Sequence, residues 1–167
     1  MKLSHPGGTV TYVTRSDQAT VDADAWQKVN DLVLAANAMD LAAFRVAYVA
    51  LDDLDDFQVA AGYLYYLLWR RASFLIRKKE PSLDDIAKLA DLVYSRWTQL
   101  VVADKVALEH TLRTVLGKSE FGAQVGGTFF AAYTSAALGV LLEDAEHELE
   151  EMRPYVASWY QRKFGAK

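Results

Sequence analysis

Residues 121–142 read FGAQVGGTFFAAYTSAALGVLL and give the clearest indication of the fold class. It contains 22 residues and no charged side chain. Small residues recur at every fourth position, and positions four apart lie on one face of an α-helix. These residues are Gly127, Ala131, Ser135 and Gly139. A second helix can approach such a face closely, so we predict that this helix packs at the centre of a bundle or at a dimer interface.

The same stretch is long enough to cross a bilayer, which takes about 20 apolar residues. Its hydrophobicity is diluted by polar residues and by four glycines, and neither flank has a strong excess of positive charge. The segments elsewhere in the chain are amphipathic, which is typical of a water-soluble protein. We therefore expect a soluble protein without a membrane span.

The composition fits a single globular domain of ordinary size. Of the 167 residues, 52% are hydrophobic and 24% are charged, which argues against a disordered chain. The net charge is −4 and neither half is basic, so we expect no nucleic-acid partner. The chain has no cysteine, and its first residues lack an apolar segment of signal-peptide length. We expect a cytoplasmic protein without disulfides or thiolate metal sites.

The pattern along the chain predicts an extended N-terminal arm over residues 1–21 and a helical bundle domain over residues 22–167. Residues 9–14 are β-prone, but they have no partner strand. The first helix is expected to begin near Asp22 or Asp24, either of which can cap it. Residues 37–40 can interrupt this helix. In all, we predict an all-α, single-domain bundle of about five to seven helices with one central apolar helix.

The second major helix is expected over residues 57–79, and Pro81 prevents it from continuing further. Ser82 and Asp85 resemble a capping box for the next helix. Its apolar residues follow at helical spacing and are expected to face inward: Ile86, Leu89, Val93, Trp97 and Leu100.

Asp104 can cap a further helix that ends at Gly117. The apolar stretch is then expected to become helical near Gly127, because the preceding glycines weaken the first turn. We expect this helix to continue toward Met152 and to kink or break at Pro154. A last helix over residues 154–164 should point Tyr155, Val156, Trp159 and Tyr160 inward.

One face of the second major helix carries tyrosine at one end and arginine at the other. These residues are Tyr63, Tyr66, Arg70 and Arg77. Tyrosine and arginine are common in interface hot spots and in ligand pockets, so this face is a candidate partner-binding or ligand-binding site. The alternative is that the tyrosines border the core and the arginines reach into water. The basic cluster of residues 70–79 and the acidic run of residues 143–151 could also meet, within one chain or between chains.

A cluster of aspartates follows the first helical segments. Asp52, Asp53 and Asp56 match the spacing DDxxD, which resembles the magnesium-binding motif of isoprenoid synthases. The resemblance covers five residues and implies a Mg²⁺-dependent diphosphate enzyme. We see no convincing second motif, and we favour the alternative that these aspartates cap helix ends.

Histidine chemistry has few candidates, because the chain contains only His5, His110 and His147. Asp144 and His147 come nearest to the Glu-x-x-His pattern of di-iron bundles, but Ala107 occupies the position where the second copy needs a carboxylate. We therefore expect no metal, no cofactor and no catalytic residue.

The leading hypothesis is a non-enzymatic helical protein that acts through association, as a homodimer or as a partner-binding module. The alternative is a bundle that binds a small hydrophobic or aromatic ligand between its helices. A Mg²⁺-dependent diphosphate enzyme using residues 52–56 is a remote third hypothesis.

Overall fold

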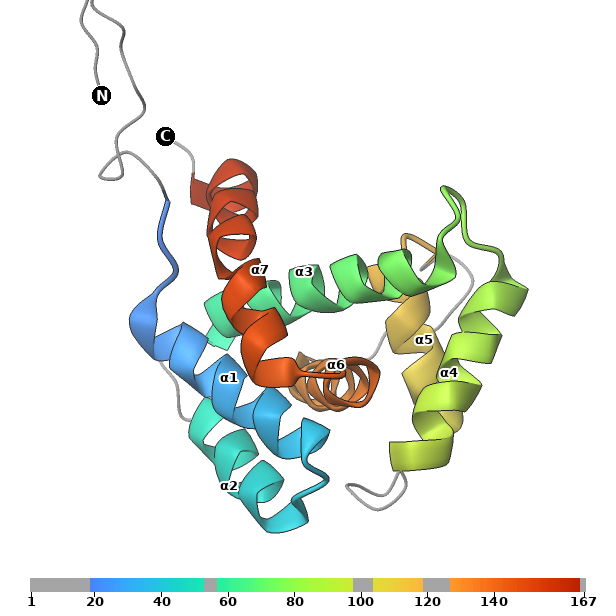
Figure 1. Ribbon diagram of the computed structural model, residues 1–167, viewed down its shortest axis with the longest axis horizontal. Coiled ribbons are helices and arrows are strands. Elements are labelled where there is room, and N and C mark those ends of the chain that lie inside the picture. Colours follow the sequence, from blue (N-terminus) through green and yellow to red (C-terminus); the bar gives the residue numbers. More distant parts are fainter. Residues whose placement is uncertain (1–18, 53–56, 98–103, 119–126, 166–167) are drawn as a thin grey trace, which may run out of the picture.

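The computed structural model of the protein describes residues 19–52, 57–97, 104–118 and 127–165. Within these ranges the chain forms seven α-helices and no β-strand, which confirms the all-α prediction (Figure 1). The helices are α1 (Ala23–Asn37), α2 (Leu41–Asp52), α3 (Phe57–Ile76), α4 (Leu83–Trp97), α5 (Lys105–Val115), α6 (Gly127–Leu141) and α7 (Ala145–Tyr160). A short π-helical turn, Gln161–Gly165, follows α7.

Helix α6 lies against four others, namely α1, α3, α4 and α5. From residue 131 to residue 142, every residue except Ala132 is buried. Figure 1 shows α6 nearly end-on, with α1 and α3 on different sides of it. Among the residues that the structure describes, no helix combines the length and the apolarity needed to cross a membrane.

Three helix starts lie where short polar side chains predicted them. Asp22 accepts a hydrogen bond from the backbone N–H of Ala25 at 2.9 Å. Ser82 and Asp85 form the predicted capping box, in which each side chain accepts from the other residue's backbone N–H, at 3.1 and 2.9 Å. Asp104 accepts from two backbone N–H groups of α5. Local hydrogen bonding therefore sets these boundaries.

The predicted interruption between the first two helices and the glycine stop are both present. Met39 has a positive φ of 57°, which turns the chain between α1 and α2. Gly117 has a φ of 81° just after α5, a conformation that glycine adopts without the strain of a Cβ.

Two predicted helix ends are wrong. Helix α3 ends at Ile76 and not at Lys79, because Arg77 takes a positive φ of 59°. Helix α6 ends at Leu141 instead of continuing toward Met152, and α7 begins at Ala145. The side chains described below satisfy the backbone groups at the second break.

The predicted helix break at Pro154 does not occur, because Pro154 lies inside α7. It is on the exposed side of the helix, where water can bond to the carbonyl that lacks its usual N–H partner. Tyr155, predicted to face inward, is 54% exposed, whereas Val156 is buried as predicted. Because α7 continues through Pro154, its helical rotation turns Val156 toward the core and Tyr155 toward solvent.

Several predictions concern residues outside the described ranges. Of the expected arm, the structure describes only residues 19–21, which are not helical. The side chain of Trp97 and all of Leu100 also lie outside the description, whereas Ile86, Leu89 and Val93 of the same predicted face are buried.

Candidate functional site

A surface groove of about 710 Å³ lies between α3 and α7, and we call it the α3–α7 groove. Both helices contribute aromatic and charged side chains to its lining. Those from α3 are Trp69, Arg70, Arg71, Ser73 and Phe74, and those from α7 are Glu148, Glu151, Met152 and Tyr155.

Three aromatic rings of the groove are open to solvent. Trp69 is 42% exposed, Phe74 is 57% exposed and Tyr155 is 54% exposed. Large aromatic side chains are usually buried, so three exposed rings around one groove form a distinct surface. They offer an apolar contact area that the described part of the chain leaves uncovered.

Arginine side chains lie over two of these rings. The guanidinium of Arg70 is 4.5 Å from the ring centre of Tyr155, and that of Arg77 is 5.3 Å from the ring centre of Phe74. Arg70 also donates a hydrogen bond of 2.9 Å to the hydroxyl of Tyr66. Stacking on a ring holds a guanidinium in a defined position and leaves its N–H donors free to meet an acceptor.

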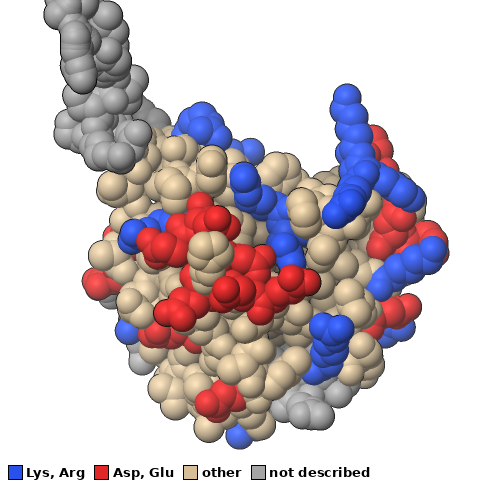
Figure 2. Space-filling view, in the orientation of Figure 1, with Lys and Arg blue, Asp and Glu red and all other residues tan. Residues whose placement is uncertain are grey.

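The two walls of the groove differ in charge. Figure 2 shows acidic side chains gathered over the first half of α7 and basic side chains beside them over α3. On the acidic wall, Glu151 lies 3.4 Å from His147. The exposed acidic residues near this wall are Glu143, Asp144, Glu146, Glu150 and Glu151.

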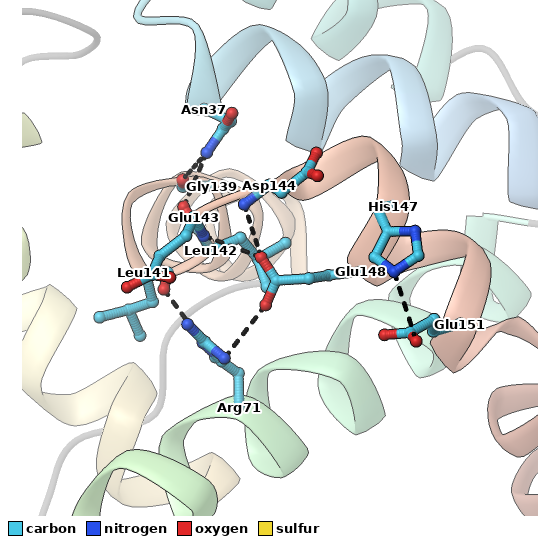
Figure 3. A network of polar contacts seen from close by, with 10 residues as sticks. All are labelled: Asn37, Arg71, Gly139, Leu141, Leu142, Glu143, Asp144, His147, Glu148 and Glu151. Carbon is cyan, nitrogen blue, oxygen red and sulfur yellow. Dashed lines mark hydrogen bonds and ion pairs between the residues drawn. The ribbon is translucent and has the colours of Figure 1, made fainter.

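An ion pair joins the two walls at the floor of the groove (Figure 3). Arg71 and Glu148 approach to 3.1 Å, and both side chains are mostly buried. Arg71 also donates to the carbonyl of Leu141 at 3.0 Å. Glu148 accepts from the backbone N–H groups of Glu143 and Asp144 at 2.9 and 2.7 Å. The predicted meeting of the basic and acidic clusters thus occurs within one chain, and it fixes the start of α7 against α3.

Asn37, from the end of α1, completes this junction (Figure 3). Its side-chain amide donates to the carbonyls of Gly139 and Leu142 at 2.9 and 2.8 Å. Carbonyls at the end of a helix lack partners within the helix, so these bonds stabilise the end of α6 where it stands. Together these polar contacts join α1, α3, α6 and α7 at one point.

The structure separates the four residues of the predicted tyrosine and arginine face. Arg70 lines the groove, Arg77 adjoins it through Phe74, and Tyr66 lies beneath Arg70. Tyr63 is instead only 3% exposed.

The hydroxyl of Tyr63 accepts a hydrogen bond of 2.8 Å from the backbone N–H of Asp22. Its ring meets those of Trp26 and Tyr160 edge-on. Burial raises the pKa of the Tyr63 hydroxyl, and the hydrogen bond from Asp22 opposes this rise. Tyr63 therefore joins the N-terminus of α1 to α3 and α7.

The predicted face of small residues lies against the chain's own helices. A Cβ atom built on Gly139 would come within 2.4 Å of the Cβ of Ala36 in α1, so only glycine fits there. Ala131 and Ser135 are fully buried, and the Ser135 hydroxyl donates to the Ala131 carbonyl at 2.6 Å. Gly127 begins α6, and its surroundings lie outside the description.

The predicted aspartate cluster falls outside the described part of the chain, apart from the backbone of Asp52 at the end of α2. Within the described ranges, no group of three or more histidine, aspartate or glutamate side chains is placed to hold a metal ion.

Sequence reasoning missed Trp69 and Phe74. Phe74 lies four residues beyond Arg70, so it shares the predicted face, and Trp69 lies beside it. A large apolar residue among the charges of a helix face was the available signal. Arg71 and Glu148 belong to the two clusters that were expected to be able to meet, but no local pattern distinguished this pair, because its members lie far apart in the sequence.

No protein-family model, curated protein or solved structure matches this chain.

Proposed function

We propose that this is a non-enzymatic protein of the cytoplasm that acts through association, and that the α3–α7 groove is its binding surface for another protein chain. The observation that carries the proposal is the set of three exposed rings at the groove, with arginines stacked on two of them. The absence of cysteine is compatible with a reducing compartment.

The size of the apolar surface supports a protein partner. With about 200 Å² for a whole aromatic side chain, the exposed fractions of Trp69, Phe74 and Tyr155 amount to about 300 Å². That value reaches the range of the largest apolar patch on a typical monomer, which is often functional. Tryptophan, tyrosine and arginine are also the residues that most often dominate binding energy at interfaces.

The floor of the groove supports the same proposal. The contacts of Arg71 and Glu148 hold the two walls together before any partner arrives. A surface that is already ordered loses less conformational entropy on binding, which favours affinity.

Affinity capture tests the proposal with two matched variants. Phe74→Glu places a charge in the groove, and Val46→Glu places the same charge on α2, where Val46 is 72% exposed. We expect immobilised wild-type protein and Val46→Glu to retain the same protein from a lysate of the source organism, this chain included as a candidate. Phe74→Glu should lose it while keeping the wild-type circular dichroism spectrum. Identical retention by all three proteins would refute the groove as the binding surface.

A small aromatic ligand is the second candidate, because the groove's volume of about 710 Å³ lies within the range of ligand sites. Arg70 could bind the carboxylate of such a ligand while the rings pack on its apolar part. A carboxylate ligand at 100 times its Kd should stabilise the protein by about 2.7 kcal/mol. A panel of aromatic carboxylates in a thermal shift assay, run on wild type and on Phe74→Ala, checks this. Equal shifts in the two proteins would place the ligand elsewhere.

A further inference from the structure

The rim of the α3–α7 groove carries a basic side chain that has no carboxylate partner within the described part of the chain. Arg70 contacts the Tyr66 hydroxyl and the Tyr155 ring, both of which are uncharged groups. The neighbouring Arg71 differs, because it is neutralised by Glu148 at the floor. A partner that brings a carboxylate to Arg70 would form a charge-assisted hydrogen bond.

The opposite rim carries the complementary feature. Glu151 is exposed, and its described partner is His147 at 3.4 Å, which carries charge only when it is protonated. A partner that brings a cation to Glu151 would complete this side. A binding surface that carries a carboxylate, a cation and an apolar area would therefore match the groove.

Building on the proposed function, we infer that the groove's partner is a second copy of this chain, related to the first by a two-fold axis that runs along the groove. A rotation of 180° about that axis turns the basic wall of one copy onto the acidic wall of the other. Arg70 of each copy then faces Glu151 of its mate, and the pair forms twice. An axis across the groove would instead set like charges against each other.

The three exposed rings line the same groove as Arg70 and Glu151. Rings from both copies meet across the axis and cover each other, which removes their apolar surface from water. A standard interface buries about 800 Å² on each partner, of which somewhat more than half is apolar. The three rings supply about 300 Å² of that apolar area, and Met152 in the same lining adds to it.

Two charge reversals test the inference. Arg70→Glu sets two glutamates face to face at each contact of its homodimer, and Glu151→Arg sets two arginines face to face. Each variant alone should raise the dimer's dissociation constant by at least about tenfold. In an equimolar mixture, the two variants form a heterodimer in which both contacts are again between opposite charges. Sedimentation velocity on the mixture should therefore recover a mass near twice the 18.6 kDa of the chain.

Glu146→Arg is the control, because Glu146 is exposed on α7 but does not line the groove. It should change the dissociation constant by less than about threefold at physiological salt, where charges are screened over about 8 Å. A wild-type protein that stays monomeric at all concentrations would overturn the inference, and so would a mixture that fails to recover the dimer. If Phe74→Glu still abolished capture of another protein, the proposed function would stand without the second copy.

Discussion

Replacing Gly139 by alanine tests how closely α6 packs against α1. The added Cβ would lie 2.4 Å from the Cβ of Ala36 and 2.8 Å from the backbone nitrogen of Asn37. Carbon atoms in favourable contact are about 3.5–4.0 Å apart, so the two helices must separate by about 1 Å. The same displacement stretches the hydrogen bonds from the Asn37 amide to the carbonyls of Gly139 and Leu142.

The expected effect is a net loss of stability. Overpacking of a tight core contact costs about 1–3 kcal/mol, and each weakened hydrogen bond adds up to about 1 kcal/mol. Alanine in place of glycine in a helix stabilises the folded protein by about 1 kcal/mol through its higher helix propensity. Gly139→Ala should therefore lower the free energy of unfolding by about 1–3 kcal/mol.

Urea denaturation of a double-mutant cycle measures this contact. Ala36→Gly removes the methyl group that the new Cβ meets first, so the double variant should lose less stability than the sum of the two single changes. The cycle would then show a favourable coupling between residues 36 and 139. Equal stability of Gly139→Ala and wild type, or effects that add within about 0.5 kcal/mol, would refute the close approach of α6 to α1.

Three further changes test other contacts. A hydrogen bond from the backbone N–H of Ser82, together with the Lys78 ammonium, lowers the pKa of Asp85 from 3.8 to about 2. Asp85→Asn should thus be less stable than wild type near neutral pH, and the gap should close as the pH falls from about 4 to about 2 in parallel denaturation curves. Tyr63→Phe removes the acceptor of the Asp22 N–H and should cost about 0.5–1.5 kcal/mol in urea denaturation, with unchanged stability as the contrary result. Glu148→Ala breaks the ion pair with Arg71 and should cost about 1–3 kcal/mol; proton exchange at the start of α7 no faster than in wild type would contradict the assigned role.

The parts of the fold that sequence predicts well are those set by neighbouring residues. Asp22, the Ser82–Asp85 pair and Asp104 act on backbone groups within three positions, so their types and spacing were enough to find three helix starts. The positive φ at Gly117 likewise follows from the one residue that adopts it freely.

The break between α6 and α7 shows why other parts escaped prediction. The next proline or glycine after Gly139 is Pro154, so the local sequence contains no strong stop signal at residues 142–144. The break is stabilised by Asn37 and Arg71, which are far away in the sequence. Such contacts exist only once the helices have packed, so no local pattern reveals them.

The sequence predicted only the α3 side of the candidate site. Helical spacing placed Arg70 and Arg77 on one face, and the structure sets them on and beside the groove. The same spacing included Tyr63, which the core covers instead. The opposite wall comes from α7, and the orientation of Tyr155 there depended on the helix passing through Pro154 without a break.

Hydroxyl-radical footprinting of the three groove rings tests whether a second copy covers the α3–α7 groove. The protein is labelled once at high dilution and once at a concentration that saturates association, and mass spectrometry reports the modification of each ring. If a second copy occupies the α3–α7 groove, Trp69, Phe74 and Tyr155 become protected at high concentration. Phe164, which is 57% exposed and does not line the groove, serves as the internal control and should react equally in both samples. Equal labelling of the groove rings at both concentrations would contradict the claim.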